Sequence, residues 1–257
     1  MADTGKVILI TGGGSGMGRE AARRFAAEGA AVALFDVNAA GMAETVGTFD
    51  SIHSWTVDMT NFDAVCAAVR EVEEKLGPIE RLYNCAAIMP FGKLVEQDNA
   101  IIHKQMAINY GGLVNITQAV LPGMLQRGRG DFVSFASMAG IIPMLLTGAY
   151  TATKFAVVAF TETLYHENMN SGVRFACVCP PAVATPLLQQ GKDTAWPKML
   201  ESQSEPIAPI VVIEAIEDCL KKGKFLVFPT RDAKIGSIMR RLLPGLIWKQ
   251  VHQVEGF

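Results

Sequence analysis

The chain has 257 residues, of which 50% are hydrophobic and 19% are charged, with a formal net charge of -2 at pH 7. This composition excludes wholesale disorder, and the charge balance lacks the basic excess of nucleic-acid binders, so we expect no nucleic-acid partner. The length fits one large α/β domain better than two small ones, and we expect a single domain over residues 1–257.

The predicted elements alternate between strands and helices along the chain. Apolar runs predict strands at 6–11, 30–36, 52–57, 81–84, 131–136, 173–179 and 225–228. Helical periodicity predicts helices at 16–28, 61–76, 98–126, 149–170 and 210–221. The proline-broken segment 186–209 is predicted to be more loop than regular element. The alternation predicts a Rossmann-type, doubly wound parallel sheet of about seven strands with helices on both faces.

Cysteine and histidine usage favours neither disulfides nor a metal site. The five cysteines are an odd number without a CxxC pair, and the four histidines show no ligand spacing with them. We therefore expect reduced thiols and no metal. No signal peptide precedes the first strand, and the low-charge stretch 140–160 holds Pro143, Gly148 and Lys154, which favours a buried loop and helix over a membrane span. The expected location is the cytoplasm.

A glycine-rich turn is predicted where the first strand meets the first helix. It runs Thr11-Gly12-Gly13-Gly14-Ser15-Gly16-Met17-Gly18. Glycines let a backbone approach a pyrophosphate closely, and the following helix points free N–H groups at the anion. A flexible turn is the plain alternative, but the strand before and the helix after favour a phosphate cradle. The spacing is GxxxGxG rather than GxGxxG.

Asp36 closes the second predicted strand at the offset expected of a ribose-binding carboxylate. A carboxylate there accepts hydrogen bonds from ribose hydroxyls and repels a 2′-phosphate, and no Arg or Lys follows at positions 37 and 38. The charge pattern therefore favours NAD over NADP. A turn-forming Asp is the alternative.

Tyr150 and Lys154 lie four residues apart, on one face of a predicted helix. A tyrosine becomes a base near neutral pH only if its pKa falls by roughly two to three units from about 10. A neighbouring ammonium at about 4–5 Å supplies an effect of that size. Taken alone, the pair is more typical of an ordinary surface helix than of a catalytic pair.

The whole set of motifs resembles the short-chain dehydrogenase/reductase family over nearly the full chain. The residues that carry the resemblance are Thr11 to Gly18, Asp36, Asp58, Asn84-Cys85-Ala86-Ala87, Asn109, Ser137, Tyr150 with Lys154, and Pro180 to Thr185. Two positions depart from the family pattern, since Ala87 and Pro181 stand where glycine is usual. They affect backbone freedom beside the cofactor rather than the chemistry.

The resemblance implies a role for each matching residue. Tyr150 matches the catalytic acid/base, Lys154 the residue that lowers its pKa and binds the nicotinamide ribose, and Ser137 the hydroxyl that positions the substrate oxygen. Asn109 matches the helix asparagine that holds a water for proton relay, although it could simply kink the helix beside Gly111-Gly112. The implied NAD contacts are Gly12, Ser15, Gly16, Met17, Gly18, Asp36, Asp58, Met59, Asn84, Ala86, Tyr150, Lys154, Val183 and Thr185. Ser134 is the alternative serine, expected to be packed in mid-strand.

The expected substrate is a lipophilic secondary alcohol or ketone, because apolar and methionine-rich segments follow the strands that carry the site. These segments are Met89-Pro90-Phe91, Met138 with Ile141 to Met144, and Leu187-Leu188. Simple packing of the loop is the alternative. Competing functions are a ketoreductase of an acyl thioester, an NAD-binding regulatory protein without turnover, and a sugar-nucleotide epimerase, which needs a larger C-terminal domain.

The tail 231–257 combines basic with apolar residues at helical spacing, interrupted at Pro244-Gly245. Such a stretch can lie on an anionic membrane, cap the pocket or pack on a sister subunit. We favour packing, since the resemblance implies a homodimer or homotetramer. Membrane association is the less favoured expectation.

Overall fold

The computed structural model describes residues 4–201 and 205–256. Positions 1–3 of the expected domain, 202–204 of the expected substrate loop and 257 of the tail therefore lie outside the described residues.

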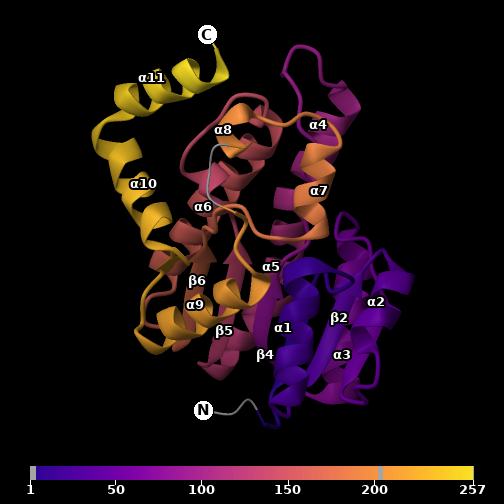
Figure 1. Cartoon of the computed structure of the whole chain (residues 1–257). Coiled ribbons are helices and arrows are strands. Elements are labelled where there is room, and N and C mark those ends of the chain that lie inside the picture. Colours follow the sequence, from indigo (N-terminus) through magenta and orange to yellow (C-terminus); the bar gives the residue numbers. More distant parts are fainter. Residues whose placement is uncertain (1–3, 202–204, 257) are drawn as a thin grey trace.

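Seven parallel strands form one sheet in the order β3-β2-β1-β4-β5-β6-β7 (Figure 1). They are β1(Val7–Thr11), β2(Ala31–Asp36), β3(Ile52–Thr56), β4(Ile79–Asn84), β5(Gly130–Phe135), β6(Val173–Val178) and β7(Leu226–Val227). The chain moves from β1 to one edge, then returns to β4 and moves to the other edge. Connections therefore leave β1 and β4 in opposite directions, and this switch point is where such sheets bind ligands. The predicted doubly wound sheet is confirmed.

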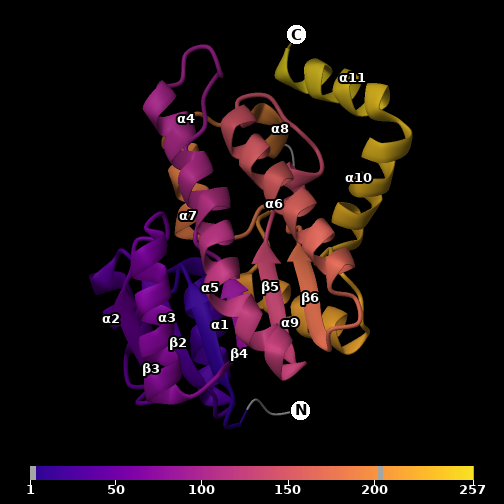
Figure 2. The same cartoon turned by 180° about the vertical axis from the view of Figure 1, so that it is seen from behind.

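Helices cover both faces of the sheet. One face carries α1(Gly16–Ala27), α2(Ala39–Val46) and α9(Pro209–Lys221), and the other carries α3(Phe62–Leu76), α5(Gly112–Arg127) and α6(Gly148–Glu167), which Figure 2 shows in front. The strand β1 explains both cores, because successive side chains of a strand point to opposite faces. Val7 and Leu9 pack under α3 and α5, whereas Ile8 and Ile10 pack under α1 and α9. A strand buried on both faces has a continuous apolar sequence, as β1 does.

The long helix expected at 98–126 is divided into three parts. α4(Asn99–Met106) passes into a π-helical turn, η1(Ala107–Gly111), before α5 begins. Hydrophobic periodicity does not register a single widened turn, so the sequence pattern predicted one continuous helix. The turn holds Asn109, whose side chain bonds to backbone outside the helix.

The expected loop at 186–209 is wrong for part of its length. It contains α7(Pro186–Lys192) and α8(Lys198–Glu201). Pro186 begins α7 because proline is well suited to the first turn of a helix, where its missing N–H costs nothing. The helix α2 was also not predicted; it begins after Asn38, whose side chain accepts a hydrogen bond from Gly41 N at 3.0 Å.

The tail forms two helices, α10(Arg231–Leu242) and α11(Pro244–Glu255), with the break at the predicted Pro244. Figure 1 shows them as an arm that leaves the sheet beside β6 and returns over α8. In the described part of the chain, no helix is both long and apolar enough to cross a membrane.

Candidate functional site

A cavity of about 320 Å³ lies at the carboxyl ends of β1, β2 and β3. Ten of the expected NAD contacts line it: Gly12, Ser15, Gly16, Met17, Gly18, Asp36, Asp58, Met59, Ala86 and Thr185. The remaining expected contacts Tyr150, Lys154 and Val183 line a second, larger cavity, and Asn84 lines neither.

The glycine turn brings three backbone segments closer than side chains would allow. Gly12 has φ +68°, and a Cβ there would lie 2.9 Å from the Cα of Ala86. A Cβ on Gly18 would collide with the carbonyl oxygen of Gly12. The side chain of Ser15 caps none of the first N–H groups of α1, so it does not compete with an anion for these donors. A turn of this kind fits the pyrophosphate of a dinucleotide.

The carboxylate of Asp36 lies directly beside the glycine turn and lines the same cavity. Its Oδ2 accepts from Gly14 N at 2.9 Å and its Oδ1 from Asn38 N at 2.9 Å. Both oxygens are thus fixed, yet each retains a lone pair for a further donor. The fixed carboxylate can accept ribose hydroxyls without rearrangement.

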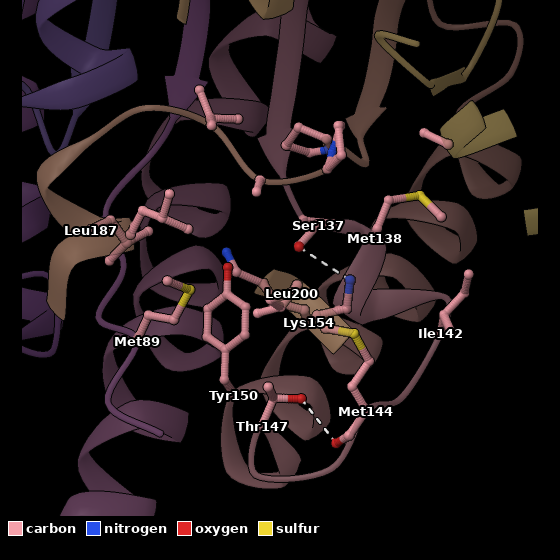
Figure 3. A pocket seen from close by; sticks show the side chains of 18 of the residues that line it. Met89, Ser137, Met138, Ile142, Met144, Thr147, Tyr150, Lys154, Leu187 and Leu200 are labelled. Atoms are coloured by element: carbon pink, nitrogen blue, oxygen red, sulfur yellow. Dashed lines mark hydrogen bonds between the residues drawn. The ribbon is translucent and has the colours of Figure 1, made fainter. Parts of the chain in front are cut away.

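The second cavity, drawn in Figure 3, has a volume of about 450 Å³. It adjoins the first, because residues such as Met17 and Cys85 line both. Ser137 enters it from the end of β5, where it caps the short helix η2(Met138–Gly140) by accepting from Ala139 N at 3.1 Å. Tyr150 and Lys154 enter from the first turns of α6 and are 5% and 3% exposed. The fold therefore brings these three predicted residues into one cavity. Ser134 lies inside β5, is fully buried and lines neither cavity.

Burial dominates the electrostatics of these groups. It raises the pKa of Tyr150, and a hydrogen bond with Ser137 acts in the opposite direction. Burial also lowers the pKa of Lys154 to about 8. The Nζ atom of Lys154 lies 5.7 Å from the centre of the Tyr150 ring and donates a hydrogen bond to Phe135 O at 2.7 Å. Burial raises the pKa of Cys85, which is the thiol with the largest electrostatic effect on Lys154. Lowering of the Tyr150 pKa by Lys154 is not among the effects of this arrangement, and it stays a prediction.

Asn109 and Asn84 make hydrogen bonds within the protein and line neither cavity. Asn109 Oδ1 accepts from Ile88 N at 2.8 Å, and its Nδ2 donates to Ile88 O and to Thr153 Oγ1. Asn84 Oδ1 accepts from Thr11 Oγ1 at 2.7 Å, which joins β4 to β1 at the switch point. The expected water-holding role of Asn109 stays a prediction.

Two residues that position the site, Gln190 and Thr194, were not predicted from the sequence. Gln190 Oε1 accepts from Met89 N at 2.5 Å, and Thr194 Oγ1 accepts from Phe91 N at 2.8 Å. They attach the end of α7 to the segment that follows β4, about a hundred residues earlier in the chain. No local pattern could have indicated them, because polar residues in a proline-broken segment are typical of exposed loops.

The walls of the second cavity are mostly apolar. Of the walls expected from sequence, Met89, Phe91, Met138, Ile142, Met144, Leu187 and Leu188 line it. The tail adds Ala233, Gly236, Ile247 and Val251. These tail residues therefore cap the pocket, which is one of the three roles considered for the tail. Within the described ranges, no group of His, Cys, Asp and Glu side chains is placed to hold a metal ion.

Comparison with known proteins agrees with this arrangement. The family model described as short chain dehydrogenase matches residues 6–196. Estradiol 17-beta-dehydrogenase 11 of Pongo abelii is 29% identical over 94% of this chain and 80% of its own length. 2-(S)-hydroxypropyl-CoM dehydrogenase 3 of Xanthobacter autotrophicus is 36% identical over 74% of this chain and 77% of its own.

Among solved structures, a short chain dehydrogenase/reductase from Burkholderia phymatum in complex with NAD superimposes with a TM-score of 0.86. It is 26% identical and covers 96% of both chains. Structures with this fold have been solved with NAD or with NADP. The comparisons thus show a dinucleotide-binding fold whose relatives act on very different alcohols.

Proposed function

Because the chain belongs to the short-chain dehydrogenase family, we propose that it is an NAD(H)-dependent oxidoreductase that interconverts a secondary alcohol and a ketone. The observation that carries the proposal is the meeting of Ser137, Tyr150 and Lys154 in an apolar cavity beside the glycine turn. The proposed roles are a proton-transferring group (Tyr150), a hydroxyl that binds the substrate oxygen (Ser137) and a cation (Lys154), and all three side chains line one mostly apolar cavity. The chain is proposed to act as one catalytic domain.

In the oxidative direction, Ser137 Oγ binds the hydroxyl oxygen of the alcohol and Tyr150 Oη takes its proton. The glycine turn and Asp36 would hold NAD, which when bound would supply the acceptor for the hydride. Lys154 favours the phenolate of Tyr150 through its charge, provided that the ammonium is protonated. Asn109 fixes the backbone at Ile88, beside the cofactor cavity, and is proposed to support a water on the proton path. In reduction, Tyr150 returns the proton to the oxygen.

The preference for NAD over NADP rests on Asp36. Its carboxylate is fixed by two backbone N–H groups at the rim of the cofactor cavity, and it would repel a 2′-phosphate. Arg19, the first cation after the glycine turn, bonds to Gly14 O, Gly41 O and Glu44, so its guanidinium already has partners within the protein. No compensating positive charge is directed at the 2′ position from these groups.

The proposed substrate class is lipophilic. The cavity walls are mostly apolar side chains from the segments after β4 and β5, from α1, α7 and α8, and from the tail, with five methionines among them. Methionines adapt to irregular apolar shapes. Glu205 and Asp232 line the cavity and are exposed, and their negative charges disfavour the anionic carrier of an acyl thioester.

The experiment is a fluorescence titration with NADH and NADPH on the wild type and on Asp36→Ala, followed by a panel of apolar secondary alcohols. We expect clear NADH preference that weakens in Asp36→Ala, and a loss of about 10²–10⁴ in kcat for Tyr150→Phe. Equal or better NADPH binding by the wild type would move the acyl-thioester ketoreductase to first place. Tight NADH binding without turnover of any alcohol or ketone would favour the regulatory protein. A cytoplasmic homodimer or homotetramer stays a prediction, which light scattering of the purified protein tests.

A further inference from the structure

The tail helices have two different apolar faces. Ala233 and Gly236 of α10 with Ile247 and Val251 of α11 line the substrate cavity. A second set points away from it, and its members are 48–70% exposed: Ile235, Ile238, Leu242, Leu243 and Leu246. We call this second set the apolar arm face.

The apolar arm face is one continuous stripe. Ile235, Ile238 and Leu242 follow the spacing of three and four residues that places side chains on one side of a helix. At 100° per residue this side is opposite to the one that carries Ala233 and Gly236. Leu243 and Leu246 extend the stripe around the turn at Pro244, which projects from the body of the molecule in Figure 1. Contiguous exposed apolar side chains of this kind mark an interaction surface.

Positive charge surrounds this stripe. Residues 231–257 hold five cations (Arg231, Lys234, Arg240, Arg241 and Lys249) against Asp232 and Glu255, a balance of +3. The whole chain has a net charge of -2, so residues 1–230 carry -5. Arg231, Lys234, Arg241 and Lys249 are exposed. The arm is therefore a basic amphipathic element on an otherwise acidic protein.

We infer that the arm docks on the surface of a bilayer that contains anionic lipid. An amphipathic helix with an apolar stripe and flanking Lys and Arg lies in the headgroup region, with its apolar side chains toward the acyl chains and its cations on lipid phosphates. A second copy of the chain fits the same surface poorly. A two-fold interface pairs the same patch of both subunits, which would bring two arms of charge +3 together. Docking of the arm on the acidic body of a second copy would be a head-to-tail contact, which does not form a closed dimer.

Docking places the substrate cavity at the bilayer, because α10 and α11 line the cavity with one face and bind the bilayer with the other. A lipophilic alcohol dissolved in the membrane then reaches the cavity by passing between tail residues rather than through water. This orientation reverses the order of our expectations for the tail, in which membrane association ranked below packing on a sister subunit. The docking itself does not depend on the proposed reaction.

The test is flotation of the full-length protein with vesicles of phosphatidylcholine alone and with added phosphatidylserine. We expect the wild type to float with the anionic vesicles, less so as salt is raised. Leu242→Asp with Leu246→Asp, and separately Lys234→Gln with Arg241→Gln, should each weaken binding by at least roughly tenfold. Val95→Asp is the matched control, because Val95 is 93% exposed and lies outside the arm; it should bind as the wild type does.

Several outcomes would overturn the docking. They are absence of the wild type from every floated fraction, equal flotation of the leucine variant, or a dimer in solution that Leu242→Asp with Leu246→Asp converts to monomer while no vesicle binds. NADH binding and turnover of a water-soluble secondary alcohol are measured on the same samples. A protein that floats but turns nothing over contradicts the proposed function alone, and a protein that turns over but does not float contradicts the docking alone.

Discussion

Lys154 shows how a single residue can serve a site at the expense of stability. Its side chain is 3% exposed and its pKa is lowered by burial to about 8, from an ordinary value near 10.5. The charged form is thus less favourable in the folded protein than in the unfolded chain, by about 3 kcal/mol at pH 7. The thiols of Cys85, Cys177 and Cys179 act in the opposite direction on this pKa, but less than burial does.

We expect Lys154→Met to abolish turnover and to raise the free energy of unfolding by about 1–3 kcal/mol at pH 7. The gain is smaller than the full burial penalty because Phe135 O loses its donor. Between pH 8 and pH 10.5 the unfolded chain holds a proton that folded Lys154 has released, so the wild type gains stability as pH rises and the difference from Lys154→Met shrinks. Thermal unfolding at pH 7 and at pH 10 measures this. The exposed Lys222→Met is the control, and a destabilised Lys154→Met at pH 7 would contradict the argument.

At the scale of elements, α7 and the segment after β4 form one unit of the site. Gln190 and Thr194 accept hydrogen bonds from the N–H groups of Met89 and Phe91. The Phe91 ring in turn meets the Tyr150 ring edge-on and stacks on the Trp196 ring. The distances between ring centres are 6.0 Å and 6.1 Å. The position of the substrate wall therefore depends on where α7 lies.

Thr194→Val removes the acceptor for Phe91 N with little change in shape. The loss of one such bond should raise KM for the alcohol about 3–10-fold, while NADH affinity stays within about twofold. Steady-state kinetics together with NADH titration separate these effects. Thr194→Ser should restore KM, and Gln189→Ala, which removes only an exposed bond to Asp193, should leave it unchanged. A parallel fall in NADH affinity would show that α7 holds the cofactor instead.

At the scale of the whole molecule, a buried ionic network joins strands and a helix that are distant in sequence. Arg81 of β4 pairs with Asp131 of β5 at 2.7 Å and with Glu217 of α9 at 2.9 Å. Arg174 of β6 pairs with Asp131 from the other side, and Tyr83 donates to Glu217. Arg81 and Asp131 lie near the starts of β4 and β5. Ser137 follows the end of β5, so the network lies at the opposite end of the sheet from the candidate site.

Asp131→Asn would leave Arg81 buried without its full counter-charge, and we expect a loss of about 3–5 kcal/mol in the free energy of unfolding. NADH affinity below the unfolding transition should be unchanged, because the network is remote from both cavities. Denaturant titration provides the first value and fluorescence titration the second. Arg129→Gln, which breaks an exposed pair with Glu80, should cost under about 1 kcal/mol. Equal losses in the two variants would mean that the buried network contributes no more than a surface pair.

The sequence by itself determined the sheet, the family and the residues that meet at its carboxyl edge. Strands such as β1 and β2 are continuous apolar runs, and Gly12 to Gly18, Asp36 and Ser137 each lie within or just after a strand. The Tyr150–Lys154 pair instead lies in the first turns of α6, where the spacing of four residues places both side chains on one face. These signals are local, because strand period, helix period and turn chemistry depend on neighbours within a few residues.

Only the tertiary structure decided how distant segments share one site. The bonds of Gln190 and Thr194 span more than one hundred residues, and the π-helical turn at Asn109 follows from contacts with Ile88 and Thr153 rather than from its own helix. The tail is the clearest case, since its sequence shows an amphipathic pattern without showing what each face meets. Long-range contacts depend on which surfaces the fold brings together, and helical periodicity carries no information about the partner of a face.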